Sequence, residues 1–100
     1  MVTVVTRMRI KDGQEQAWDE AFRERAEAAR EQDGFVFVQL CRPEDAPSER
    51  VIVGTWQTRE AWQEWHEQPA FVETRQQLEE VDEERAGTQW YDVVVEERRT

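Results

Sequence analysis

Two short segments of the chain carry apolar side chains on both parities, and they limit the possible folds more than any other feature of the sequence. They are residues 35–42 (FVFVQLCR) and residues 50–56 (RVIVGTW). A strand with one face in water alternates apolar and polar side chains, whereas a strand covered on both faces is apolar throughout. A polar turn, residues 43–49, separates the two segments. We therefore predict a hairpin of two strands whose faces are both covered.

The first third of the chain predicts a strand followed by a helix. Residues 2–10 (VTVVTRMRI) are rich in β-branched side chains, and Val2, Val4, Met8 and Ile10 share one parity, with Thr6 as the polar member. Asp12 and Glu15 have the spacing of a capping box, which predicts that a helix begins near residue 14. Gly34 is expected to end this segment, with the last helical residue near 32. The apolar stripe of the helix consists of Trp18, Ala21, Phe22, Ala28 and Ala29.

The second half of the chain predicts two helical segments and a final strand. Thr58 is a suitable N-cap for a short helix that carries Trp62 and Trp65. Pro69 interrupts this helix and is well placed as the first residue of a second helical segment. Residues 89–97 (QWYDVVVEE) are expected to close the chain as the fourth strand.

These elements follow the order β-α-β-β-α-β, which is the order of the ferredoxin-like fold. We predict an α+β protein with a four-stranded antiparallel sheet and both helical segments on one face. Such helices would leave the other face of the sheet open, although the two strands of the hairpin are apolar on both parities. A second copy of the chain, packed sheet against sheet, would cover that face. We therefore expect a homodimer.

Composition limits the partners and the location. One hundred residues leave room for a single domain, residues 1–100. The 23 Asp and Glu against 13 Lys and Arg disfavour nucleic acid and anionic membrane surfaces as partners. No apolar run approaches the roughly 20 residues needed to span a bilayer. Cys41 is the single cysteine and the chain opens without a signal sequence, so we expect a cytoplasmic protein.

Motifs for the common chemistries are missing from the sequence. There is no Gly-rich phosphate loop and no catalytic triad pattern, and one His with one Cys does not predict a metal site. The candidates are instead polar side chains on faces that periodicity assigns to the interior. Arg75, four residues after Phe71 on an apolar stripe, either extends its head to solvent or lines a pocket as a fixed cation that holds an anionic oxygen.

Four further residues have both a structural and a functional interpretation. Trp62 and Trp65 either pack in the core or at a dimer contact, or form a flat wall for a planar ligand. His66 is either a surface residue or a general base, because its side chain exchanges a proton near neutral pH. Thr6 is either a β-branched strand residue or a hydrogen-bond donor to a ligand.

Residues 51–71 (VIVGTWQTREAWQEWHEQPAF), together with Gly34-Phe35 and residues 7–13 (RMRIKDG), resemble the antibiotic biosynthesis monooxygenase (ABM) family. The most specific part is the pattern T-W-x-[ST]-x-E-A-W-x-x-W-x-x-x-P-x-F, and the resemblance extends over nearly the whole chain. It implies a homodimer whose two sheets form an α+β barrel, with a pocket in each subunit between sheet and helices. Some members oxygenate phenolic polyketides to quinones without metal or flavin, and others degrade haem.

The haem-degrading branch of this family uses an Asn on the first strand, a Trp in the short helix and an iron-binding His ten residues after that Trp. The equivalent positions here are Thr6, Trp65 and Arg75. Arginine has no lone pair to donate to iron, so the resemblance does not extend to haem degradation. His66 follows Trp65 directly, about 100° round the helix, and is a poor substitute.

We therefore expect a monooxygenase that acts on a phenolic or anthrone-type aromatic substrate with O₂ and needs no cofactor. Trp65 would stack on the ring, Arg75 would stabilise the phenolate and His66 would act as the base. The candidate substrate-binding residues are Thr6, Trp62 and Phe71. Two alternatives stay open: a protein that binds haem or another planar aromatic without transforming it, and a dimeric module without activity.

Overall fold

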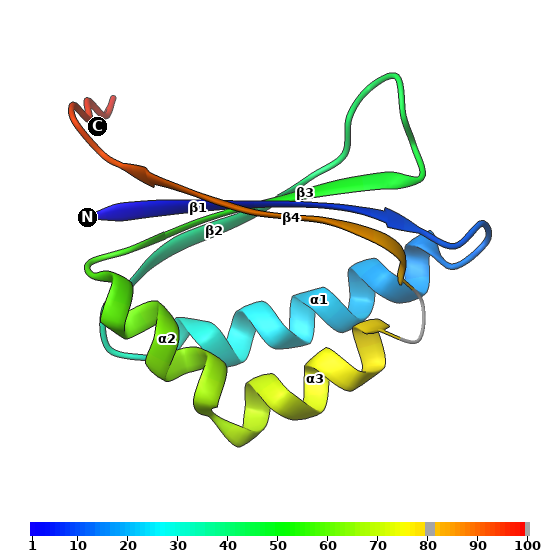
Figure 1. Ribbon diagram of the computed structural model, residues 1–100, viewed down its shortest axis with the longest axis horizontal. Coiled ribbons are helices and arrows are strands. Elements are labelled where there is room, and N and C mark those ends of the chain that lie inside the picture. The colour runs from blue at the N-terminus through cyan, green and yellow to red at the C-terminus, as the bar shows by residue number, and fades with distance from the viewer. Residues whose placement is uncertain (80–81, 100) are drawn as a thin grey trace.

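The computed structural model describes residues 1–79 and 82–99, and the side chains of residues 1–75 and 87–99. The elements are β1 (Val2–Ile10), α1 (Glu15–Arg30), β2 (Phe35–Cys41), β3 (Glu49–Trp56), α2 (Arg59–Glu67), α3 (Pro69–Glu79) and β4 (Asp82–Asp92). The strands form one antiparallel sheet in the order β2-β3-β1-β4. All three helices lie on one face of the sheet (Figure 1). The predicted ferredoxin-like α+β fold is confirmed.

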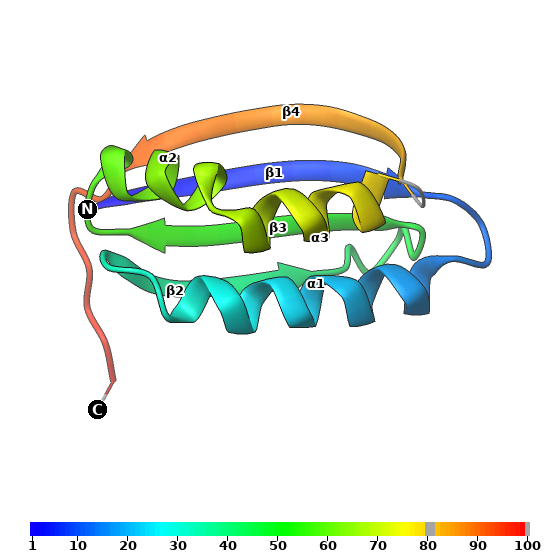
Figure 2. The same ribbon diagram turned by 90° about the horizontal axis from the view of Figure 1, so that it is seen from below.

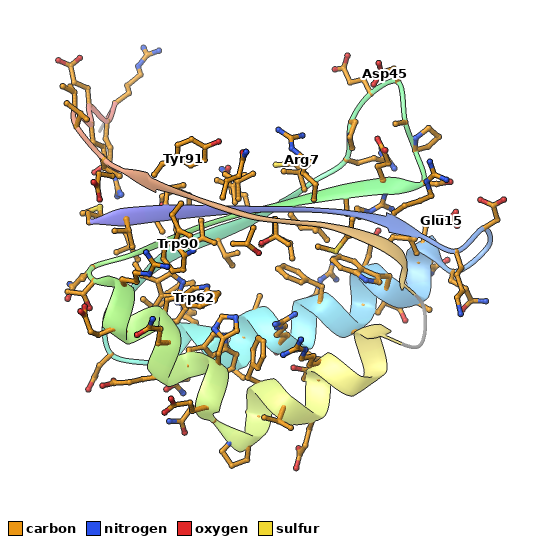
Figure 3. All side chains as sticks on the ribbon, viewed as in Figure 1. Arg7, Glu15, Asp45, Trp62, Trp90 and Tyr91 are labelled. Atoms are coloured by element: carbon orange, nitrogen blue, oxygen red, sulfur yellow. The ribbon has the colours of Figure 1, made fainter. Side chains whose placement is uncertain are left out.

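The central strand β1 aligns the whole sheet, because it pairs with both β3 and β4. Its side chains alternate, as predicted: Val4, Met8 and Ile10 are buried on the helix side. Arg7 belongs to the other parity and points away from the helices (Figure 3). In the view from below, α1 runs along the β2 side of the sheet, and α2 and α3 follow one another beside it (Figure 2).

The predicted capping box at the start of α1 is wrong. The residue before the helix is Gln14, which makes no side-chain cap, and Asp12 lies in the preceding turn. Gly13 adopts a left-handed φ of 84° in this turn, and the N–H of Gln14 donates to the Lys11 carbonyl at 2.9 Å. The turn therefore places Asp12 too far from the first helical N–H groups to cap them.

The last strand also differs from the prediction, which placed it at residues 89–97. It runs over Asp82–Asp92, and Asp92 pairs with Val2 at the start of β1. The N–H of Val93 donates to the Met1 carbonyl at 3.1 Å. The strand ends there because β1 offers no further partner. It begins before residue 89 because the other end of β1 pairs with residues 82–85.

The apolar core has two clusters, one toward each end of the space between sheet and helices. The first contains Met8, Ile10, Trp18 and Phe22, with the two rings stacked at 5.4 Å. The second contains Ala29, Trp56, Trp65 and Phe71. Large aromatic side chains thus supply much of the buried area in a chain with five Trp and four Phe residues.

Gly34 fixes the position of α2 relative to the start of β2. It has a φ of 86°, and a Cβ built on it would lie 2.6 Å from the Cβ of Ala61 in α2. Its carbonyl accepts from the N–H of Gln57 at 2.7 Å, just before α2 begins. Only a residue without a side chain permits both this backbone conformation and this close approach of the helix.

The face of the sheet opposite the helices carries partly exposed apolar side chains. By register, Val5, Val51, Val53 and Phe37 share this face, and each is partly buried. Tyr91 is 49% exposed there and points away from the helices (Figure 3). None of the described helices lies over this face (Figure 1). Among those helices, none has the length and apolar character that a membrane crossing requires.

A partly buried ion pair joins α1 to β3. The Arg50 guanidinium donates from Nε to Asp19 Oδ1 at 2.8 Å and from Nη2 to Oδ2 at 3.1 Å, and Nη1 donates to the carbonyls of Pro47 and Glu49. The side chain of Arg50 is 4% exposed and that of Asp19 is 40% exposed. The two hydrogen bonds to Asp19 satisfy donors of a guanidinium that is largely shielded from water.

Removal of the Asp19 charge should weaken this connection. We expect Asp19→Asn to lower the free energy of unfolding by about 1–3 kcal/mol, because it leaves a buried guanidinium without its anionic partner. Urea denaturation followed by circular dichroism, at one protein concentration, measures the change. Glu24→Gln, at an exposed position of the same helix, should stay within about 0.5 kcal/mol of the parent. Equal effects of the two substitutions would contradict the prediction.

Candidate functional site

A cavity of about 290 Å³ lies between the sheet and the helices, between the two core clusters. Every strand and every helix contributes to its wall. Its volume is near the lower end of the ~300–1,000 Å³ typical of small-molecule sites. Phe22 from the first cluster and Trp56 from the second both line it.

The structure brings the six residues singled out from the sequence into the wall of this cavity. They are Thr6, Trp62, Trp65, His66, Phe71 and Arg75. Trp65 and Phe71 are buried, with 4% and 2% of their surface exposed. Their shared location fits a common site, and their individual roles stay predictions.

The junction between α2 and α3 assembles the aromatic part of the wall. Thr58 caps α2 as predicted, since its Oγ1 accepts from the Ala61 N–H at 3.1 Å. The chain is extended at Gln68, with ψ 143°, and α3 begins at Pro69 as predicted. This bend places the centroids of the Phe71 and Trp65 rings 5.7 Å apart, in an edge-to-face arrangement.

His66 is held in one orientation by its neighbours. Its Nδ1 lies 2.8 Å from the Trp62 carbonyl oxygen. A carbonyl only accepts, so Nδ1 carries the proton, and in the neutral ring the lone pair belongs to Nε2. The ring lies between Trp62, at 3.6 Å between centroids, and Phe71, at 4.0 Å. The imidazole is therefore a partly buried member of the cavity wall.

Two predicted polar residues have distinct environments. Thr6 lies on β1, and its hydroxyl is 3.1 Å from the hydroxyl of Thr88 on β4. Arg75 lines the cavity from α3 but is exposed, so it lies at the rim of the cavity. Its position on the apolar stripe had indicated the interior. A long side chain on an apolar stripe can reach the surface in this way.

Sequence reasoning missed Arg25, the most deeply buried charged group of the described cavity wall. Arg25 is 8% exposed on α1, and its guanidinium carbon lies 4.0 Å from the centre of the Phe71 ring. A signal existed, because Arg25 lies three residues after Phe22 and four before Ala29, on the helical stripe. A stripe of α1 defined by its apolar residues alone leaves Arg25 out.

Sequence reasoning also missed two residues of β4, Thr88, which lies just before the predicted start of the strand, and Trp90, which lies inside it. Thr88 lines the cavity beside Thr6. Trp90 lies behind Trp62, with ring centroids 4.7 Å apart, and both side chains are on the helix side of the sheet (Figure 3). Trp90 also contacts Arg59, whose guanidinium carbon lies 4.3 Å from the centre of the Trp90 ring. Through these two contacts, β4 packs against α2.

The cavity wall carries basic side chains, whereas the chain as a whole is acidic. The described lining residues include Arg25, Arg75 and His66 and no carboxylate, whereas the chain has a formal net charge of -10. Among the described side chains, those of residues 1–75 and 87–99, no group of three or more His, Cys, Asp or Glu could hold a metal ion. The site can thus accept an anionic oxygen beside a flat aromatic surface.

Comparison with protein families assigns the chain to a family. Residues 1–77 match the family model described as antibiotic biosynthesis monooxygenase. The chain belongs to the ABM family. The predicted resemblance is thereby confirmed. A comparison with curated proteins gave no significant match.

Solved structures share the fold of this ABM protein at low sequence identity. SnoaB from Streptomyces nogalater, described as a cofactor-independent oxygenase, superposes with a TM-score of 0.83 at 23% identity, over 99% of this chain and 94% of SnoaB. Rv0793 from Mycobacterium tuberculosis gives 0.84 at 20% identity, over 95% and 96% of the two chains. A conserved protein from Methanosarcina mazei gives 0.85 at 14% identity, over 90% and 89%.

A cavity-filling substitution tests whether the cavity of this ABM protein is a ligand site. Gly54 lines it from β3, and a Cβ there would meet only ordinary contacts, 3.6 Å from Val38 Cγ2 and 3.8 Å from Trp56 Nε1. We expect Gly54→Val to keep the fold and to weaken binding of 1-naphthol about tenfold or more, because its methyl groups occupy the space. Tryptophan fluorescence measures the binding.

Gly54→Ala is the graded control and should have a smaller effect, since a single methyl fits against its neighbours. Unchanged affinity in the folded Gly54→Val variant would show that aromatic ligands bind elsewhere.

Proposed function

We propose that this ABM protein is a small cofactor-independent monooxygenase that oxygenates a phenolic or anthrone-type aromatic substrate with O₂. The observation that carries the proposal is a cavity whose wall combines an indole, an imidazole and a guanidinium, those of Trp65, His66 and Arg75. Membership of the ABM family and the fold shared with a cofactor-independent oxygenase support the same chemistry.

The proposed reaction converts a ring CH₂ group of the substrate to a carbonyl. A base removes one proton, and the resulting carbanion, delocalised onto the conjugated ring carbonyl oxygen as a phenolate, forms a C–O bond with O₂. The peroxide anion takes the proton back and becomes a hydroperoxide. Loss of the second proton breaks the O–O bond and leaves C=O and one water. The two C–H bonds supply the four electrons that reduce O₂, so that CH₂ and O₂ give C=O and H₂O.

Each residue of the site has a role in this proposal. Nε2 of His66 is the base, because Nδ1 is committed to the Trp62 carbonyl. Arg75 stabilises the phenolate as a permanent cation, and Trp65 stacks on the ring. The other substrate-binding residues are Thr6, which donates to a substrate oxygen, and the rings of Trp62 and Phe71, which exclude water.

Oxygen uptake with a hydroxyanthrone, in the presence of a chelator, tests the proposal. We expect His66→Gln to lower kcat by about 10²–10⁴-fold, because the variant lacks the base, while the affinity for 1-naphthol stays close to that of the parent. Glu67→Gln, at the exposed neighbouring position, should keep full activity. A combined substitution of Trp65 and Arg75 that left turnover intact would remove this assignment of the site.

Sequestration of a planar aromatic such as haem is the second candidate, favoured by the three aromatic rings in the cavity wall, those of Trp62, Trp65 and Phe71. The iron-ligand position of the haem-degrading branch is occupied by Arg75, which cannot coordinate iron. A hemin titration that gave a sharp, shifted Soret band with defined stoichiometry, without oxygen uptake on hydroxyanthrones, would favour this candidate over the oxygenase.

We also propose that the working protein is a homodimer of single-domain chains that pack sheet against sheet into a barrel, in the cytoplasm. The apolar face formed by Val5, Phe37, Val51 and Val53 supports this arrangement. The segment after β4 adds apolar surface, since Val94 and Val95 are 91% and 79% exposed. It leaves the sheet on the side opposite the helices (Figure 1). The single exposed Cys41 suits a reducing compartment.

A charge placed in the middle of the open face should separate the subunits. We expect sedimentation velocity at micromolar concentration to give dimers for the parent chain and monomers for Val53→Glu, since burial of an unpaired carboxylate would oppose association. Ala17→Glu, which adds the same charge at an exposed position of α1, should remain dimeric. A monomeric, folded parent chain would overturn the dimer proposal.

A further inference from the structure

Arg25 is a buried charge for which the proposed reaction has no use. The side chain is 8% exposed, lines the cavity from α1 and places its guanidinium 4.0 Å from the centre of the Phe71 ring, itself only 2% exposed. Charged side chains are rarely buried unless a partner or a ligand repays the desolvation. Stacking on Phe71 fixes the plane of the guanidinium and reduces the entropy that a ligand contact would otherwise cost.

The surroundings of Arg25 favour an anion. In a chain with 23 acidic and 13 basic residues, the described part of this wall contains two guanidinium groups and an imidazole without any carboxylate. The two arginines come from different helices, Arg25 from α1 and Arg75 from α3, and only Arg75 is exposed. A guanidinium has five N–H donors, so Arg25 can keep a contact within the protein and still donate to a ligand.

We infer that the substrate carries a carboxylate in addition to its phenolic oxygen, and that Arg25 is the specificity-determining residue that binds this carboxylate. The substrate class is thus a hydroxylated aromatic acid. The inference rests on the proposed function, in which the phenolate takes one cation and leaves the second for another anionic group. A planar carboxylate matches the two parallel N–H donors of a guanidinium, and a site with little water strengthens that pairing.

A purely structural role for Arg25 has a different consequence. If the guanidinium only held α1 against α3 through Phe71, its removal would loosen the cavity and weaken all aromatic ligands alike. If it binds a carboxylate, its removal weakens acidic ligands alone. Two probes with the same rings, 1-hydroxy-2-naphthoate and 1-naphthol, separate these cases, because they differ only in the carboxylate.

Titrations followed by fluorescence of the cavity tryptophans give the affinities of both probes for the full chain. We expect the parent to bind 1-hydroxy-2-naphthoate at least about tenfold more tightly than 1-naphthol, as charge-assisted hydrogen bonds of this kind provide. Arg25→Gln should abolish the preference and leave the 1-naphthol affinity within about threefold. Arg23→Gln, at an exposed position of the same helix, should retain the preference.

Arg25→Lys serves as a second variant if Arg25→Gln does not fold. It keeps the charge but loses the bidentate fork, so an intermediate preference supports the inference. Equal affinity of the parent for the two probes, or equal loss of both in Arg25→Gln, overturns it. Oxygen uptake on a hydroxyanthrone without a carboxylate would then leave the proposed oxygenase standing. Failure of the parent to bind either probe would overturn both the inference and the proposed function.

Discussion

The separation of the core into two aromatic clusters is the constraint on which the rest of this structure depends. At one end, Trp18 and Phe22 stack between α1 and the sheet, and at the other, Trp56, Trp65 and Phe71 fill the space beneath α2 and α3. Bulky rings at both ends hold the helices away from the sheet, and smaller residues lie between them. The cavity follows from this arrangement, because the chain has few Leu and Ile side chains to fill the middle.

The same aromatic rings also position the polar groups of the site. Phe71 contacts the imidazole of His66 on one hand and the guanidinium of Arg25 on the other. The backbone of Trp62 selects the protonated nitrogen of His66. Packing and the placement of polar groups are therefore linked here, because residues of the aromatic core contact His66 and Arg25. A site of this kind tolerates few changes in ring size or helix position.

One-sided coverage of the sheet links the fold to the proposed assembly. The three helices protect one face, and the chain has no further element with which to protect the other among its described residues (Figure 1). The apolar side chains of that face were visible in the sequence as strands without alternation. An exposed apolar sheet of this size is costly for a marginally stable domain, and association of two copies offsets that cost.

The sequence by itself determined those parts of the protein that depend on neighbours along the chain. The alternation of β1, the hairpin of β2 and β3, the cap at Thr58 and the break at Pro69 were all predicted correctly. Each of these depends on short-range sterics, hydrogen bonding or hydrophobic periodicity, which a linear pattern records. The six candidate site residues, singled out partly through the family pattern, line one cavity, and their roles stay predictions.

Only the tertiary structure decided the rest. The bounds of β4 follow from where β1 begins and ends, and Thr88 entered the site with them. Arg25 is buried because Phe71, 46 residues later in the chain, lies against it. The capping box failed because the turn at Gly13 had already placed Asp12 outside the helix. In each case the deciding partner is distant in the sequence or depends on the path of the backbone, so local composition could not reveal it.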